Sequence, residues 1–157
     1  MFYFFGKQFK HMNQYILVSQ MNLLLDLKTV SASNIFFTET NPNMLFDGIF
    51  TKINYCDEFF TMYGIFMNVP VEHVPYAKTK IESDMLNLLI KTENDILQLY
   101  TKSKKTNFKI IYKLTEFLQN KYTATNSQIH VEKPKYLKIS GIWENQNNEV
   151  GLSFKFY

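Results

Sequence analysis

The last 22 residues constrain the fold most strongly, because two segments with strand-like alternation flank a polar turn. Leu137, Ile139 and Trp143 are spaced to share one face of the first segment, and residues 145–148 read Asn-Gln-Asn-Asn, which is typical of a turn. In the second segment, apolar residues alternate with polar ones: Val150, Leu152, Phe154 and Phe156 against Glu149, Ser153, Lys155 and Tyr157. This pattern predicts an antiparallel hairpin whose apolar side chains are buried, with Trp143 as an anchor in the core.

A second hairpin is predicted in the middle of the chain, where residues 48–54 and 59–68 are both rich in Phe, Ile, Thr and Tyr. Phe50 and Lys52 lie on the even-numbered side of the first strand, and both sides carry apolar or aromatic residues. A hairpin with one solvated face would alternate more cleanly. We therefore expect either a cover over the second face or a binding platform there, formed by the even-numbered positions and the Tyr63 side of the second strand.

Helical spacing of apolar residues predicts a helix over residues 83–102, followed by lysines that suit the helix dipole. Residues 108–121 fit either a helix or a strand, and we favour a helix. Residues 34–39 resemble a short strand in composition. The sequence thus predicts one α+β domain over residues 1–157: an antiparallel sheet or a small OB-like barrel built from hairpins, with one or two helices inserted between them.

The compartment is indicated by features that the sequence lacks. A single cysteine, Cys56, excludes an internal disulfide framework and favours a reducing, intracellular compartment. No apolar run approaches the roughly 18 to 20 residues of a membrane-spanning helix, and we expect no secretory signal. All 17 basic residues are lysine, and residue types with A/T-rich codons make up about half of the chain, which indicates an A/T-rich source such as a virus, a plasmid or a parasite.

Motifs for catalysis, metal binding or nucleotide binding are weak. The histidines, which are His11, His73 and His130, have no metal-ligand spacing, and the five glycines are too far apart to form a phosphate loop. Cys56 beside His73 would form a thiol nucleophile pair, but a half-buried turn cysteine is the favoured interpretation. Carboxylate pairs such as Glu93 with Asp95 are interpreted as solvated surface charges. We expect a protein that is not an enzyme and uses no metal or cofactor.

Lysines and aromatic residues form the remaining candidate site. Residues 101–157 hold 10 Lys against 4 Glu, a net charge of +6, with aromatic residues interleaved. The absence of arginine removes bidentate recognition of phosphate and guanine, but single-stranded nucleic acid needs only stacking rings and point charges. Tyr136, Trp143 and Tyr157 on the terminal hairpin, and Phe66 on the central one, are rings of the right type. The predicted nucleic-acid-binding residues are Phe50, Lys52, Tyr63, Lys102, Lys104, Lys105, Lys109, Lys113, Lys138 and Lys155.

Two stretches carry a resemblance to a known family. YLKISGIWENQNNEVGLSFKFY at residues 136–157 and MYGIFMNVP at residues 62–70 are similar to small single-stranded-DNA-binding proteins of large insect-infecting DNA viruses and related elements. In that family, a strand reading roughly I-S-G-I-W-E precedes a turn and a G-L-x-F/Y-K-F strand. The resemblance implies a role in DNA replication of a virus-like element, in the host-cell nucleus or at a cytoplasmic replication site.

The leading hypothesis is a non-enzymatic protein that binds single-stranded nucleic acid, DNA in preference to RNA, away from membranes and as a monomer or a homo-oligomer. The alternative is a protein-interaction or scaffold module, such as a viral host-interaction factor, that uses the same rings as an exposed patch. A small hydrolase or nuclease built on dispersed carboxylates is a third hypothesis. The residues around the exposed rings distinguish the first two hypotheses. Lysines are expected around a stacking platform, whereas mixed polar residues are expected around a protein-interaction patch.

Overall fold

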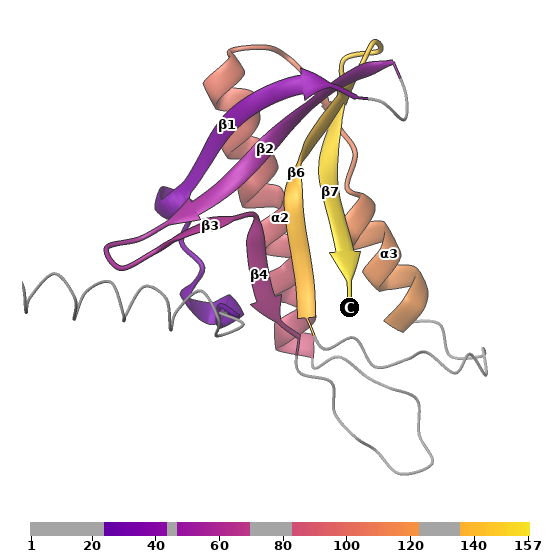
Figure 1. Cartoon of the computed structure of the whole chain (residues 1–157). Helices are drawn as coiled ribbons and strands as arrows, with labels where there is room; N and C mark the ends of the chain where they lie inside the picture. Colours follow the sequence, from indigo (N-terminus) through magenta and orange to yellow (C-terminus); the bar gives the residue numbers. More distant parts are fainter. Residues whose placement is uncertain (1–23, 44–46, 70–82, 123–135) are drawn as a thin grey trace, which may run out of the picture.

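The computed structural model describes residues 24–43, 47–69, 83–122 and 136–157 and shows an α+β fold (Figure 1), as the sequence predicts. Its strands are β1 (Ile35–Pro42), β2 (Gly48–Cys56), β3 (Thr61–Tyr63), β4 (Ile65–Asn68), β5 (Lys109–Ile110), β6 (Tyr136–Asn145) and β7 (Glu149–Phe156). Its helices are α2 (Ser83–Lys104) and α3 (Lys113–Tyr122), and two short 3-10 helices, η1 (Leu27–Thr29) and η2 (Ala32–Asn34), precede β1.

The sheet is forked around its central strand, β6. The main order is β1-β2-β6-β7-β5, and every pair in it is antiparallel except β5 with β7. β2 pairs with the second half of β6 through residues 48–52, and the end of β2 then pairs with β3. β4 pairs with the first half of β6. One arm of the fork is therefore β1-β2-β3 and the other is β4-β6-β7. Of the two predicted forms, the mostly antiparallel sheet is confirmed, and because it stays open the OB-like barrel does not form.

One face of the sheet carries the hydrophobic core and is covered by α2 and α3, which lie behind and beside the strands in Figure 1. The core combines residues at helical spacing with alternate residues of the strands. They include Leu89, Ile96, Leu97, Leu114 and Leu118 from the helices and Ile53, Ile65, Met67, Leu137, Ile139, Ile142, Val150 and Leu152 from the strands. The helix predicted over 83–102 is confirmed and extends to Lys104. No helix of the described part is long and apolar enough to cross a membrane.

The terminal hairpin forms as predicted, with β6 and β7 joined by the expected turn. Val150 and Leu152 are buried, as predicted. Phe154 and Phe156 also face the helices, but they are only half-buried, and their rings contact Phe117 of α3 with centroids 5.9 and 5.2 Å from it. The aromatic end of β7 therefore holds α3 against the sheet.

The predicted position of Trp143 in the core is wrong, because a β-bulge reverses the alternation of β6. The register with β7 shifts between Ile139 and Gly141, so the residues after the shift change face. Ile142 takes the core position opposite Leu152, and Trp143 lies half-buried on the other face. One extra residue in the strand is enough to produce this change, because side chains alternate with a period of two.

The predicted central hairpin forms only near its turn. β2 and β3 pair at two positions, Cys56 with Thr61 and Tyr55 with Met62. The chain then bends at Gly64 and continues as β4 along β6. Gly64 has φ 98°, and a Cβ at this position would lie 2.9 Å from the carbonyl oxygen of Ile139. Glycine is required here both for the backbone conformation and for the close approach. The second strand of the expected hairpin therefore contributes to both arms of the fork.

The segment at 108–121 contains both of the structures between which the sequence does not decide. Residues Lys109–Ile110 form the short parallel strand β5, and α3 begins at Lys113. The strand expected at 34–39 is confirmed as β1 and extends to Pro42. In both segments, the sequence pattern left open where a strand or helix begins and ends, because the ends are the least well defined part of an element.

The N-terminus of α3 is capped by a side chain of α2. Glu93 is fully buried, and its carboxylate accepts hydrogen bonds from the backbone N–H groups of Leu114 (2.9 Å) and Thr115 (2.7 Å) and from the Thr115 hydroxyl (2.7 Å). A carboxylate in this place satisfies N–H groups that have no partner within the helix and interacts favourably with the helix dipole. The interpretation of Glu93 as a solvated surface charge is therefore wrong.

Replacing Glu93 with alanine should lower the free energy of unfolding by about 2–4 kcal/mol, because buried N–H groups lose their acceptor. Glu93→Gln keeps the size and one acceptor oxygen, so it should cost about half as much. Urea unfolding followed by circular dichroism measures both. Glu116→Ala, an exposed carboxylate in the first turn of α3, is the matched control and should change stability by less than about 0.5 kcal/mol. A Glu93→Ala variant as stable as the wild type would contradict the capping role.

Candidate nucleic-acid interface

The face of the sheet opposite the core is where many of the predicted aromatic and lysine residues lie. Thr51 and Ile53 of β2 face the core, so Phe50 and Lys52 point to the other side. Within the part of the chain that the structure describes, no helix crosses this other side, which is the front of the sheet in Figure 1. We call it the open face.

Two rows of side chains cross the open face on β4, β6 and β7. In the first row, Tyr136 and Tyr157 are joined by backbone hydrogen bonds in both directions (3.2 and 3.0 Å), and their rings stack with centroids 4.9 Å apart at 13°. In the second row, Lys138 has Phe66 as its partner on β4 and Lys155 as its partner on β7. We call these five residues the tyrosine–lysine patch.

The two lysines of the patch face each other across neighbouring strands, an arrangement of like charges that destabilises a sheet. Their side chains approach different rings: the Lys138 Nζ lies 5.0 Å from the centre of the Phe66 ring, and the Lys155 Nζ lies 4.6 Å from that of Tyr157. These distances are in the range of cation–π contacts. Neither lysine forms an ion pair with another described residue. The patch therefore presents two available ammonium groups beside three rings.

The open face continues from the patch to the β1-β2-β3 arm through Gly64. The Cε of Lys138 lies only 3.6 Å from the point where a Cβ on Gly64 would be, so the lysine side chain passes over the bend between β3 and β4. Beyond the bend lie Tyr63, which is 82% exposed, and Phe36, which is 51% exposed. Phe36 is the partner of Asn54 in β2. Aromatic side chains thus extend over both arms, with a lysine at their junction.

Phe50 and Trp143 also lie on the open face, but both pack down onto the sheet. A Cβ on Gly141 would lie 2.4 Å from the Phe50 ring, and one on Gly151 would lie 2.4 Å from the Trp143 ring. The Trp143 indole N–H donates a hydrogen bond to the carbonyl of Leu152 (3.2 Å). One side of each ring is therefore occupied by the backbone of a neighbouring strand, and Phe50 offers less ring surface to a ligand than its predicted role suggests.

Four of the predicted lysines already have carboxylate partners. The pairs are Lys52–Glu39 (2.6 Å), Lys104–Glu144 (3.8 Å), Lys109–Glu149 (2.6 Å) and Lys113–Glu116 (3.2 Å). The hydrogen bond from Lys52 lowers the pKa of Glu39, and hydrogen bonds from Lys109 and Asn145 lower the pKa of Glu149. A phosphate would compete with these carboxylates for the ammonium groups, whereas for Lys138 and Lys155 no described carboxylate competes.

The lysines at the end of α2 are distant from the patch. Lys102, Lys104 and Lys105 are exposed at the helix C-terminus and just after it, where they complement the dipole. Lys104 contacts Glu144, which is six residues along β6 from Lys138. At a rise of about 3.3 Å per residue, that separation is about 20 Å. The densest lysine run of the sequence and the two lysines of the patch are therefore separate surfaces.

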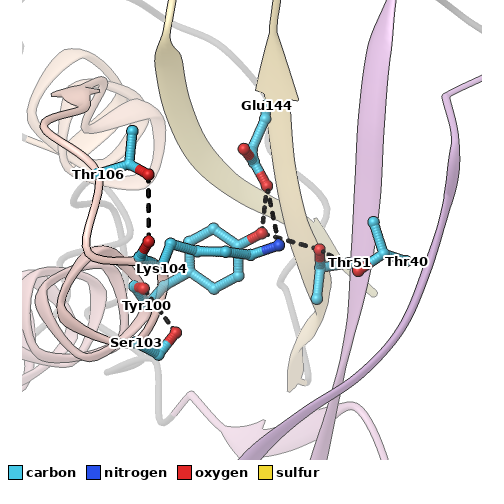
Figure 2. Close-up of polar contacts among 7 residues, drawn as sticks. All are labelled: Thr40, Thr51, Tyr100, Ser103, Lys104, Thr106 and Glu144. Atoms are coloured by element: carbon cyan, nitrogen blue, oxygen red, sulfur yellow. Dashed lines mark hydrogen bonds and ion pairs between the residues drawn. The ribbon is translucent and has the colours of Figure 1, made fainter.

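A polar network joins α2 to three strands on the covered side of the sheet (Figure 2). The buried Tyr100 hydroxyl donates to Glu144 and lies 2.9 Å from the Thr51 hydroxyl, which is 3.1 Å from that of Thr40. The Nζ of Lys104 is 3.8 Å from the same Glu144 carboxylate. Burial, together with the bond to Glu144, raises the pKa of Tyr100 above its ordinary value. These groups satisfy one another, so we assign the network a structural role.

Within the described ranges, no group of three His, Cys, Asp or Glu side chains is placed to hold a metal ion. Cys56 is half-buried at the end of β2 and accepts a hydrogen bond from the Thr61 hydroxyl (3.1 Å), as expected of a turn cysteine. His73, its hypothetical partner in a nucleophile pair, lies outside the described residues together with His11 and His130.

Comparison of the chain with protein-family models, with curated proteins and with solved structures finds no significant match. The candidate site is therefore argued from geometry alone. Of the predicted residues, the structure brings Lys138 and Lys155 together and exposes Tyr63 on the same face. The convergence of Phe66 with the terminal hairpin depends on the pairing of β4 with β6, and that pairing left no signal in the local pattern.

Tyr100→Phe should lower the free energy of unfolding at neutral pH by about 1–2 kcal/mol, because Glu144 and Thr51 lose a hydrogen-bond partner. The raised pKa of Tyr100 adds a pH dependence. Stability from this hydroxyl is fully present below the ordinary tyrosine pKa of about 10 and is lost as the pH rises toward the raised value. The difference between wild type and variant should therefore be constant up to about pH 9 and shrink above about pH 10.

Guanidinium unfolding of both proteins across this pH range measures the difference. The matched control is Tyr112→Phe, which removes an exposed hydroxyl bonded to Asn94. Its difference from the wild type should be small at every pH. A difference for Tyr100→Phe that stays constant up to about pH 11 would contradict the proposed coupling between the network and stability.

Proposed function

We propose that this protein is a non-enzymatic single-stranded nucleic-acid-binding protein that uses the open face of its sheet as the binding surface. The observation that carries the proposal is the tyrosine–lysine patch, in which two lysines face each other with no described carboxylate partner and with three rings beside them. Following the resemblance of the terminal hairpin, we further propose DNA as the ligand and replication of a virus-like element as its process.

The chemistry of a single strand matches the two kinds of group in the patch. Bases without a pairing partner stack on aromatic rings, and lysines neutralise the phosphates that link them. Tyr157 is 43% exposed and lies beside the Lys155 ammonium, so a ring surface and a positive charge are offered together. A phosphate between Lys138 and Lys155 would also relieve the repulsion of the two facing charges.

The shape of the surface favours a single strand over a duplex. Proteins that read duplex DNA insert a helix or a two-stranded ribbon into the major groove. The patch instead spreads over three adjacent strands of a broad sheet. Lysine also contacts phosphate as a point charge and does not provide the bidentate contact by which arginine recognises guanine.

The alternative, a protein-interaction module, is favoured by the turn between β2 and β3, at the end of the β1-β2-β3 arm. Phe59 is 78% exposed in the turn between β2 and β3, and its neighbours in the turn include Asp57 and Glu58. An exposed ring among acidic residues is unfavourable for a nucleic acid and typical of a protein contact. If the wild-type protein binds no oligonucleotide, this alternative becomes the better account.

The salt dependence of oligothymidine binding tests the role of the lysines. Each phosphate contact on a single strand contributes about 0.7 to the slope of log affinity against log salt. Lys138→Ala combined with Lys155→Ala should therefore reduce the magnitude of the slope by about 1.4 and weaken binding at low salt. Fluorescence anisotropy of a labelled oligothymidine between about 20 and 200 mM salt measures this, with a labelled oligouridine beside it to compare DNA and RNA.

The control for the lysine experiment is the double variant Lys91→Ala and Lys102→Ala. It removes the same charge from exposed lysines of α2, which lies on the covered side of the sheet. The slope of this variant should match that of the wild type. Equal slopes for the wild type and the Lys138/Lys155 variant would contradict phosphate binding by the patch, whatever the affinity.

Stacking is tested by removing one ring of the patch. Tyr157→Ala should weaken oligothymidine binding by about 1–3 kcal/mol, the usual contribution of one stacked base. The melting temperature should change little because the ring is 43% exposed. Tyr112→Ala removes a ring of similar exposure, 38%, on the helical side of the molecule and should leave binding unchanged. Unchanged affinity for Tyr157→Ala would show that bases do not stack there.

A further inference from the structure

The turn between β2 and β3 presents an exposed ring in a fixed conformation. Phe59 is 78% exposed, although its side chain is large and apolar. The Asp57 carboxylate accepts hydrogen bonds from the backbone N–H groups of Phe59 (2.8 Å) and Phe60 (3.1 Å), and the Asp57 N–H donates to the carbonyl of Phe60 (3.1 Å). A turn held in this way loses little conformational freedom when it binds a partner. We call residues 57–60 the Phe59 turn.

Exposure is a property of Phe59 and not of the whole turn. The next residue, Phe60, is half-buried, and its ring stacks on that of Tyr55 with centroids 6.2 Å apart. The two ends of the turn are joined by the hydrogen bond from the Thr61 hydroxyl to Cys56. One phenylalanine therefore anchors the turn to the sheet, and the other points away from it.

The β1-β2-β3 arm that carries the Phe59 turn is acidic. Residues 35–63 hold four carboxylates against one lysine, a net charge of −3. Two of the carboxylates, Asp57 and Glu58, directly precede Phe59, and neither forms an ion pair with another described residue. An exposed ring beside two free negative charges repels phosphates and suits a basic surface of another protein.

The end of α2 has the complementary charge. Residues 101–122 hold six lysines against one glutamate, a net charge of +5. Lys104 and Lys105 are exposed, and Lys105 forms no ion pair with another described residue. Half-buried Phe108 lies with its ring 6.3 Å from that of Tyr100, over which the Lys104 Nζ lies at 5.3 Å. We call Lys104, Lys105 and Phe108 the α2 end.

The Phe59 turn and the α2 end lie at opposite ends of β2, so they cannot meet within one chain. Lys104 contacts Glu144, whose strand partner is Ile49 near the start of β2. The turn follows Cys56, which is seven residues after Ile49. At a rise of about 3.3 Å per residue, this separation is about 23 Å. Figure 1 shows the same arrangement, with the turn at the left and the end of α2 at the top.

We infer that the Phe59 turn of one copy binds the α2 end of a second copy of this chain. Glu58 pairs with the two lysines in this contact, and the Phe59 ring packs against Phe108 and the lysine stems. Because the two surfaces are different and lie at opposite ends of the protein, the contact joins copies head to tail in an open chain. Neither surface belongs to the tyrosine–lysine patch, so the inference goes beyond the proposed function and does not depend on it.

The mass of the protein in solution tests this contact. A contact of this size is at the weak end of protein interfaces, so sedimentation velocity is measured between about 10 and 500 µM on nuclease-treated protein. The weight-average mass of the wild type should rise with concentration beyond that of a dimer. It should fall again when the salt is raised from about 50 to 500 mM, because exposed ion pairs are screened.

Two variants each remove one of the surfaces. The turn variant, Glu58→Lys with Phe59→Ala, leaves Asp57 in place so that the turn stays formed. The α2-end variant is Lys104→Gln with Lys105→Glu. Each variant alone should stay monomeric over the whole concentration range. An equal mixture of the two should form a 1:1 dimer and nothing larger, because only the intact α2 end of the first and the intact turn of the second remain.

The matched control is Asp84→Lys combined with Tyr112→Ala. This variant changes the charge by the same amount and removes one exposed ring, at the start of α2 and before α3. Its association should equal that of the wild type. Thermal melting of every variant establishes that it is folded.

The results are decisive in either direction. A wild type that stays monomeric up to about 500 µM, or that stops at a dimer, would overturn the inference. It would also be overturned if either variant associated like the wild type, or if the mixture of the two gave no dimer. None of these results affects oligothymidine binding by the patch, which is measured with dilute, monomeric protein.

Discussion

β6 forms backbone hydrogen bonds with β2, β4 and β7, and both arms of the sheet depend on these bonds. Along one edge, β4 occupies the first half of β6 and β2 occupies the second half. The bend at Gly64 lets the chain pass from one arm to the other, and the bulge before Gly141 keeps Ile142 in the core after the strand changes partner. Because of this division, side chains from β1 to β7 reach one continuous open face.

Polar side chains have different partners on the two faces of the sheet. On the covered side, Glu93 caps α3, and Tyr100 bonds to Thr51 and Glu144. Among the described residues, no buried side-chain nitrogen or oxygen lacks a hydrogen-bond partner, as expected where an unpaired group would be costly. On the open face, the lysines of the patch have rings rather than carboxylates as neighbours. This contrast is the physical basis for our proposal that the open face binds a ligand.

Local patterns in the sequence predicted the elements whose contacts are close in the chain. The hairpin of β6 and β7 and the helix α2 follow directly from alternation and from helical spacing. The errors have specific long-range causes. Trp143 lies outside the core because a β-bulge in β6 reverses the alternation. The second strand of the predicted central hairpin is divided because β4 pairs with β6, a strand that begins almost 70 residues after it. The burial of Glu93 also has a long-range cause, because its hydrogen-bond partners lie at the N-terminus of another helix.

By itself, the sequence determined the α+β class, the terminal hairpin and the kinds of side chain that a single-strand-binding surface would use. Only the tertiary structure decided which of those side chains meet. It separated Lys138 and Lys155 from the lysines that are paired with carboxylates, and it brought Phe66 beside them across a long-range strand pair. The physical reason is that alternation states which residues share a face of one strand, whereas register, bulges and strand order determine which strands share that face.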